Sequence, residues 1–225
     1  MEMDRSIAYY GRVLFYCKVM RKILYILILV SLSVSGYSQT ARELEIIEIV
    51  SRSTARMKSL ECDFVQTKHI SMLNDKMISK GKMYYQQPDR LRWEYITPYS
   101  YTFILNASQV MLKNSGRTDV IDVNRNRMFK EIARIMMDSI LGRCLTDEKS
   151  FRTEIAENER EWVATLYPQK KDMKQMWSRL VIHFDRSSET VVKVEMHEPG
   201  GDHTVIDLKN ININKTLDQQ VFTIE

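Results

Sequence analysis

The chain has 225 residues, and its 33 lysines and arginines against 29 aspartates and glutamates give a formal net charge of +4. Five of these basic residues and two of the acidic ones lie in residues 1–38, which leaves 28 against 27 in residues 39–225, a net charge of +1. This balance excludes the clustered basic surface that nucleic-acid binding requires, and the 187 residues from 39 to 225 suit one domain better than two.

The first 38 residues have the pattern of an export signal. Met20-Arg21-Lys22 is a basic start, and residues 23–34 are apolar but too few for the roughly 20 that span a membrane. Gly36-Tyr37-Ser38 then places small residues before a cut at Gln39. We interpret residues 1–19 as an over-extended start, with Met20 as the true one. We therefore expect a cleaved signal peptide, a periplasmic location and one mature domain from residue 39 to residue 225.

The first part of the mature chain predicts one helix and then a meander of strands. Residues 41–58 carry apolar side chains at three- and four-residue spacing, which predicts an amphipathic helix. From Glu61 the apolar period changes to two, as is typical of strands. Strands are predicted at residues 61–70, 78–86, 91–96, 101–106, 110–113 and 118–123, separated by turn residues such as Asn114-Ser115-Gly116.

A second helix interrupts the strands at residues 126–145, where Phe129, Ile132, Met136 and Ile140 form an apolar stripe at helical spacing. Strands resume at residues 151–157, 161–167, 176–184, 190–197, 202–213 and 221–224. The predicted fold class is mainly β, of the α+β type, with about ten or eleven short strands in a sheet long enough to curl.

No catalytic motif is present in the sequence, so we do not expect an enzyme or a bound cofactor. The segment from His197 to His203 holds two histidines and two carboxylates around Pro-Gly-Gly, a composition that suits a hairpin turn better than a metal site. Cys62 and Cys144 remain in the mature chain, and an oxidising compartment would allow either a disulfide between them or two separate buried thiols.

The ordered motifs of the mature chain resemble the periplasmic outer-membrane lipoprotein carrier (LolA-like) family. The amphipathic helix leads to Phe64-Val65-Gln66, which is similar to the family's short F-x-Q strand. Gly81, Tyr84, Pro88, Trp93 and Pro98 follow in the family's order, and the match continues through the central helix and residues 162–168 to residues 202–222. The resemblance spans nearly the whole mature chain.

This resemblance implies an incomplete antiparallel barrel, with a helical lid over an apolar cavity, that carries acylated lipoproteins from an inner-membrane ABC exporter toward an outer-membrane acceptor. We expect a monomer. The eleven methionines of residues 39–225 suit an adaptable interior. Alternation along the strands predicts that the cavity is lined by Phe64, Trp93, Tyr95, Phe103, Leu105 and Met111, and capped by Phe129, Ile132, Met136 and Ile140.

Two further roles follow from the resemblance. The family commonly has an arginine before the first proline, where it holds the lid of the empty carrier closed, but this chain has Gln87 there. The latch would therefore rest on Gln87, Arg90 or Arg92. Leu91 occupies the place of an exposed apolar residue near the cavity mouth, which predicts a contact with the exporter, whereas alternation alone would allow it to face the core.

Two other functions remain open from the sequence. The same architecture could carry a different lipid or a glycolipid, because an acyl-binding cavity does not specify what is attached to the acyl chain. A periplasmic module that senses lipid or lipoprotein and regulates a membrane partner is the second alternative.

Overall fold

The computed structural model describes residues 41–73, 75–122, 134–135, 137–139 and 141–223. The chain divides into two compact units, Met1–Glu45 and Ile46–Glu225. Of the first unit the structure describes residues 41–45, which are helical and belong to a helix over residues 41–56. The second unit contains the strands and the hydrophobic core. Within the described residues, no helix is long and apolar enough to cross a membrane.

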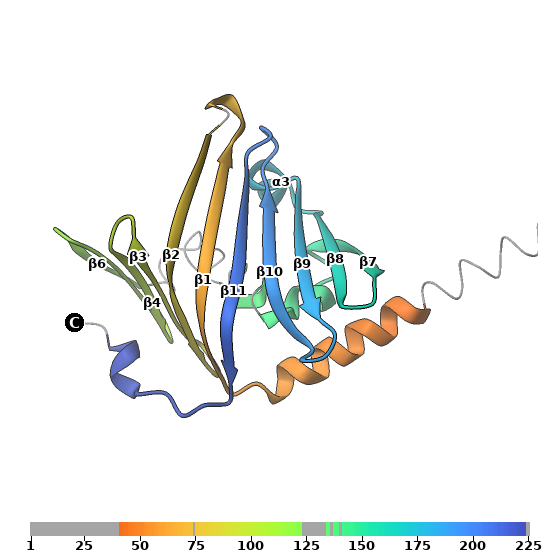
Figure 1. Cartoon of the computed structure of the whole chain (residues 1–225), viewed down its shortest axis with the longest axis horizontal. Coiled ribbons are helices and arrows are strands. Elements are labelled where there is room, and N and C mark those ends of the chain that lie inside the picture. Colours follow the sequence, from red (N-terminus) through yellow and green to blue (C-terminus); the bar gives the residue numbers. More distant parts are fainter. Residues whose placement is uncertain (1–40, 74, 123–133, 136, 140, 224–225) are drawn as a thin grey trace, which may run out of the picture. The chain divides into compact units, whose positions relative to one another are not determined.

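In the described part of the chain eleven strands follow the first helix, and most begin and end close to the predicted positions (Figure 1). They are β1 (Ser59–Ile70), β2 (Asp75–Gln86), β3 (Arg90–Thr97), β4 (Tyr101–Asn106), β5 (Gln109–Asn114), β6 (Thr118–Asp122), β7 (Phe151–Glu157), β8 (Glu161–Pro168), β9 (Arg179–Asp185), β10 (Thr190–His197) and β11 (His203–Ile213). The short helices are η1 (Ser71–Leu73), η2 (Arg143–Thr146), α3 (Lys171–Met176) and η3 (Gln219–Phe222).

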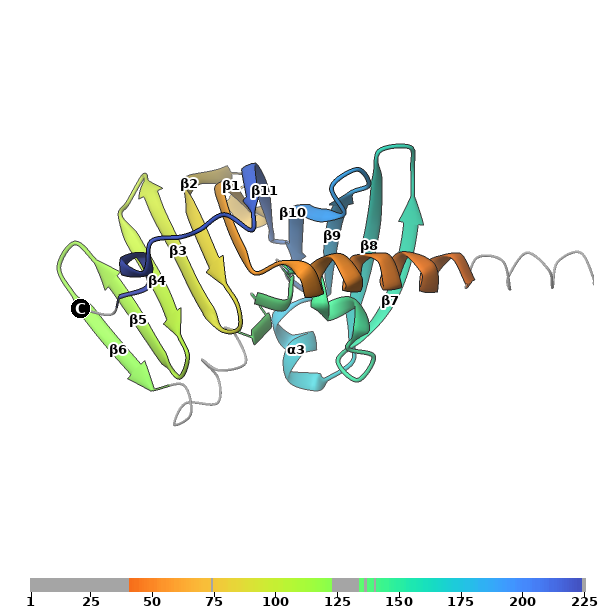
Figure 2. The ribbon, with the colours of Figure 1, turned by 90° about the horizontal axis from the view of Figure 1, so that it is seen from below.

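All eleven strands form one antiparallel sheet in the order β6-β5-β4-β3-β2-β1-β11-β10-β9-β8-β7. The pairing of β1 with β11 joins two meanders, β1 to β6 and β7 to β11. The edge strands β6 and β7 lie at opposite ends of the sheet, so the barrel is not closed (Figure 2). The predicted fold class, an incomplete antiparallel β-barrel, is confirmed.

One face of the sheet carries the core. On β1 the buried residues Leu60, Cys62 and Phe64 alternate with more exposed ones, as expected for a strand with one face against the interior. The same alternation recurs on β8, where Trp162, Ala164 and Leu166 are buried. Strict alternation on the central strands therefore defines an inner face and an outer face.

Two of the predicted strands differ from the structure, one in its start and one in its type. The segment 176–184 was predicted as one strand, but α3 ends at Met176 and β9 begins at Arg179. Residues 221–224 were predicted as a strand, but Val221 and Phe222 belong to the 3-10 helix η3. The Asp218 side chain accepts a hydrogen bond from the Gln220 backbone N–H at 2.9 Å, which caps this short helix and turns the chain away from an extended path.

Part of the predicted central helix lies within the described residues. Residues 134–135, 137–139 and 141 are helical, and η2 follows after Gly142. This segment buries Ile135, Met137 and Leu141 in the same core cluster as Ile46 and Val50 of the first helix. Both helical segments therefore contribute side chains to the core on the inner face.

Candidate apolar binding cavity

A cavity of about 310 Å³ lies at the inner face of the sheet. Strands β1, β3, β9, β10 and β11 contribute its wall, and the central helical segment and the loop after α3 complete it. Nearly all of the lining surface is carbon and sulfur. The lining residues are Gln66, Trp93, Tyr95, Ile135, Ser139, Trp177, Leu180, Val194, Met196, Ile206 and Leu208.

Three aromatic rings pack together at one wall of the cavity, which Trp93 and Tyr95 line. The Phe64 ring centroid lies 4.6 Å from that of Trp93 and 5.1 Å from that of Tyr95, the latter in an edge-on arrangement. Phe64 can lie here because its partner on β2, Gly81, has no side chain. A Cβ at position 81 would lie 2.6 Å from the Phe64 ring and 1.9 Å from the Glu94 carbonyl oxygen. The glycine of the sequence motif is therefore a packing requirement of the aromatic wall.

The cavity has few polar groups. The Tyr95 hydroxyl donates to Gln66 Oε1 at 2.8 Å, so these two polar groups satisfy each other. Burial raises the pKa of Tyr95, which keeps its hydroxyl protonated and neutral at physiological pH. Among the described residues, the buried indole N–H of Trp93 has no hydrogen-bond acceptor. The arrangement suits an apolar ligand with at most one or two polar atoms.

An ion-pair cluster fixes the helical residues beside the cavity. Arg134 and Arg143 both contact the Asp138 carboxylate, each at 3.1 Å. Arg134 also reaches Asp147 at 3.3 Å, which ties the helical segment to the loop before β7. Burial raises the pKa of Asp138 although both arginines oppose the shift. Ile135 and Ser139, which line the cavity, lie on this restrained segment.

Apart from Met111, the predicted cavity residues fall into three groups. Trp93 and Tyr95 line the cavity, and Phe64 packs behind them. Phe103 and Leu105 pair with Trp93 and Leu91 across β3 and β4, so they are buried on the same face but further along the sheet. The four predicted capping residues, Phe129, Ile132, Met136 and Ile140, lie outside the described residues.

Met111 does not lie on the cavity face. In β5 it pairs with Ile104, whereas its neighbours Val110 and Leu112 pair with Leu105 and Phe103. The prediction was wrong because residues 110–112 are apolar on both faces of the strand, so alternation could not show which face points inward. Register with β4 places Met111 on the outer face.

Sequence reasoning missed most of the lining residues. Five of them belong to β9, β10 and β11, and the alternation of buried and more exposed positions on β9 and β11 could have indicated an inner face, whereas a register shift interrupts it on β10. Trp177 lies in the loop after α3 and carries no periodic signal. The lining residues not predicted for the cavity are Gln66, Ile135, Ser139, Trp177, Leu180, Val194, Met196, Ile206 and Leu208. Three of them carried a signal: Gln66 in the F-x-Q motif, Ile135 in the apolar stripe of the central helix and Met196 on an apolar strand face.

The predicted latch residues contact other parts of the chain. Arg90 Nη1 donates to Gln219 Oε1 at 2.5 Å, and Arg92 Nη1 donates to the Val221 carbonyl at 3.3 Å. Both arginines lie on the outer face, because they alternate with Leu91 and Trp93, and they tether η3. Gln87, which precedes a cis proline, donates its backbone N–H to the Lys58 carbonyl at 2.9 Å.

Leu91 and the two cysteines are buried. Leu91 is 1% exposed and belongs to the core, so in this structure it offers no surface to an exporter. The alternation of β3 decides its position. Cys62 and Cys144 are free thiols, and burial raises the pKa of each to about 12. The cysteines therefore act as core side chains here and do not form a disulfide.

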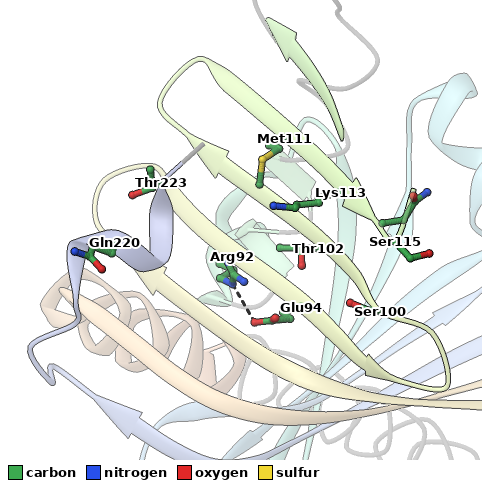
Figure 3. A pocket seen from close by; sticks show the side chains of 10 residues that line it. Arg92, Glu94, Ser100, Thr102, Met111, Lys113, Ser115, Gln220 and Thr223 are labelled. Carbon is green, nitrogen blue, oxygen red and sulfur yellow. Dashed lines mark hydrogen bonds and ion pairs between the residues drawn. The ribbon is translucent and has the colours of Figure 1, made fainter. Parts of the chain in front are cut away.

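A second, larger pocket of about 760 Å³ lies on the outer face, between β3, β4, β5 and η3 (Figure 3). Arg92 and Glu94 of β3 form an ion pair of 3.0 Å in its floor, and Lys113 projects from β5, on the far side of β4. The remaining lining is mostly hydroxyl and amide groups: Ser100, Thr102, Met111, Asn114, Ser115, Gln220 and Thr223. Its polar surface is unsuited to acyl chains, so we place the candidate site in the smaller cavity.

The fold and the cavity define a class of protein, the open antiparallel sheets that enclose an apolar cavity between one sheet face and helical segments. The family model "Outer membrane lipoprotein carrier protein LolA" matches residues 55–225. The chain belongs to the LolA family. Membership indicates binding of lipid or lipoprotein, and it indicates an exported, periplasmic protein.

Comparison with solved structures agrees at the level of the fold. An uncharacterised conserved protein from Thermus thermophilus superposes with a TM-score of 0.52 at 8% identity, over 83% of this chain and 95% of that one. The lipoprotein LppX of Mycobacterium tuberculosis gives a TM-score of 0.46 at 10% identity, over 79% and 98%. A LolA superfamily protein from Nitrosomonas europaea gives 0.42 at 7% identity, over 80% and 97%. No curated protein matches the sequence.

Proposed function

We propose that the protein is a periplasmic carrier that shields the acyl chains of lipoproteins in its apolar cavity and transfers them from an inner-membrane ABC exporter toward the outer membrane. The observation that supports this most is the apolar lining of the inner-face cavity, whose polar groups Tyr95 and Gln66 satisfy each other. Membership of the LolA family supports the same reading.

The energetics of an acyl chain in water make such a cavity necessary. Exposure costs about 0.8 kcal/mol for each CH₂, so a chain of roughly fifteen methylenes would cost about 12 kcal/mol to expose. Contacts with Leu180, Ile206 and Leu208 replace those of the membrane without demanding a particular chain shape.

The cavity of about 310 Å³ lies at the small end of the range for ligand sites. Entry of several chains therefore requires Ile135 and Ser139 to move away from the sheet, and the ion pairs of Asp138 oppose that movement. An external source of energy, the exporter, would provide the loading work. The proposal also includes cleavage of the leader before Gln39 and release of cargo to an outer-membrane acceptor.

The experiment is uptake of a fluorescent fatty acid by residues 39–225, with displacement by a synthetic diacylated lipopeptide. Ile206→Trp should fill the cavity and weaken uptake by about tenfold or more, whereas Val205→Trp, on the outer face of the same strand, should not. Leu208→Phe is a milder filling variant in case the tryptophan prevents folding.

Displacement of the fluorescent fatty acid by the lipopeptide supports the proposal that the protein carries lipoproteins. Displacement by phospholipid or glycolipid alone would assign the cavity to a different lipid cargo. Equal uptake by Ile206→Trp and Val205→Trp, with thermal unfolding like that of the parent, would contradict the assignment of this cavity as the acyl-binding site.

A further inference from the structure

The hairpin of β1 and β2 extends beyond the strands beside it. The last pair of β2 with β3 is Lys80 with Thr97, so residues 75–79 have no partner on β3. On the other side, the last pair of β1 with β11 is His69 with His203. The hairpin tip, which we define as residues 70–73 and 75–80, therefore extends past the end of β3, whereas β11 accompanies β1 as far as His69 (Figure 1).

This tip exposes large apolar side chains. Met72 is 92% exposed, Leu73 67%, Met77 50% and Ile78 47%. Ile96 and Tyr99, at the neighbouring end of β3, are also exposed. These six account for more than half of the ten exposed large hydrophobic residues in the described part of the chain. Met77 and Ile78 are successive residues of β2 and point to opposite faces, so exposed apolar side chains surround the end of the hairpin, and an accumulation of this kind marks an interaction site.

The tip is held in place by the hairpin of β10 and β11. The Ser71 backbone N–H donates to Asp202 Oδ1 at 2.9 Å, and the Ser71 hydroxyl donates to the same oxygen at 2.8 Å. Gly201, at φ +94°, sits against this contact, because a Cβ there would lie 3.3 Å from Ser71 Oγ. Met72 and Leu73 are thus presented by a restrained turn.

Lysines outnumber carboxylates along the hairpin itself, and the two carboxylates of the neighbouring hairpin, Glu198 and Asp202, are engaged with Lys68 and Ser71. Residues 68–80 contain three lysines against one aspartate, a net charge of +2. Lys68 is paired with Glu198 at 3.3 Å. Among the residues that the structure describes, no carboxylate lies within ion-pair distance of Lys76 or Lys80. Apolar side chains flanked by lysines are the composition of segments that sit at an anionic membrane surface.

We propose that this tip docks the protein on the surface of an anionic phospholipid bilayer. Met72 and Leu73 enter the boundary between headgroups and acyl chains, while Lys76 and Lys80 contact lipid phosphates. Gln66, which lines the cavity, lies four residues before Ile70, the last residue of β1, which is roughly 13 Å along the strand. Docking therefore brings the cavity close to a membrane. The docking itself does not depend on which cargo the cavity binds.

Co-sedimentation with vesicles tests the proposal. Residues 39–225 are used because the apolar stretch 23–34 would itself enter vesicles, and this segment contains the whole compact unit Ile46–Glu225. The parent should bind vesicles of equal parts phosphatidylglycerol and phosphatidylcholine more tightly than vesicles of phosphatidylcholine alone. The double variant Met72→Ser with Leu73→Ser should bind at least about tenfold more weakly.

The lysines should supply the preference for anionic lipid. Lys76→Gln and Lys80→Gln should each weaken binding by about fivefold and reduce the effect of salt. Val120→Ser and Lys149→Gln, exposed residues away from the tip, are the matched controls and should bind like the parent.

Fatty-acid uptake is measured on the same samples and should be equal in all of them, which separates docking from cargo binding. Failure of the parent to bind anionic vesicles, or equal binding by parent and tip variants, would overturn the proposal and point to a protein partner for the tip.

Discussion

The Thr54 hydroxyl donates a buried hydrogen bond of 2.6 Å to the backbone carbonyl of Leu141. Thr54 belongs to the first helix, and Leu141 ends the helical segment that contributes Ile135 and Ser139 to the cavity. One hydrogen bond therefore links the two helical segments in the core. Since the helix ends at Gly142, this bond satisfies a carbonyl that would otherwise be buried without a donor.

We predict that Thr54→Val lowers the free energy of unfolding by about 1–3 kcal/mol, because the shape is kept and the carbonyl loses its donor. Thr54→Ser keeps the hydroxyl and should cost less. Urea unfolding of both variants measures the difference. Equal stability of the valine and serine variants would show that the hydrogen bond contributes nothing.

Gly142 follows Leu141 in the chain, and its backbone conformation favours glycine. Its φ is +70°, and a Cβ there would lie 2.6 Å from the Phe184 ring and 3.0 Å from Val50. Gly142→Ala should therefore destabilise the protein by about 1–3 kcal/mol. Gly116→Ala is the control, because nothing lies within 4 Å of a Cβ there, and it should stay within about 0.5 kcal/mol of the parent. Thermal and urea unfolding measure both changes.

The two thiols should be unreactive in the folded protein. Burial raises the pKa of Cys62 and of Cys144 to about 12, so the reactive thiolate is scarce and shielded. We expect a thiol reagent to label neither cysteine at neutral pH and to label both in denaturant without a reductant. Failure to label them in denaturant until a reductant is added would show that a disulfide forms after all.

Acid should weaken a row of charges on the outer face. His183 contacts Glu161 at 3.0 Å and Glu195 at 3.2 Å, and His197 contacts Glu195 at 3.0 Å. The hydrogen bond with His183 lowers the pKa of Glu161. For Glu195 burial acts to raise the pKa, but the contacts with His197 and His183 together lower it.

A glutamate with a lowered folded-state pKa contributes its full stability above its unfolded value, about 4.5, and loses it as the pH falls through the folded value. The parent should therefore lose unfolding free energy below about pH 4.5, and Glu195→Gln should lose less over the same range. Urea unfolding between about pH 6 and pH 3 measures both slopes. Parallel slopes would contradict the role of this row.

The sequence predicted the fold well where one face of a strand is apolar and the other polar. Trp93 and Tyr95 alternate with Arg92 and Glu94, so their inward direction followed from period two. Met111 lies in a run that is apolar on both faces, and there only the pairing of β5 with β4 decides the direction.

Long-range partners explain the other differences. Arg90 and Arg92 bind η3, which lies 129 positions later in the chain, and no local pattern indicates that contact. The same holds for Trp177, which reaches the cavity from a loop. The sequence could predict an apolar cavity. It could not predict the wall on β9 to β11, because that wall is placed by the pairing of β1 with β11, far apart in the chain.

Native mass spectrometry of the exported protein, purified from a periplasm without detergent and followed by organic extraction, tests the central claim most directly. We expect acylated lipoprotein bound one to one to the parent and to Val205→Trp, and no bound lipoprotein on Ile206→Trp. Protein that emerges free of any ligand, and that also refuses an apolar dye, would contradict the carrier function.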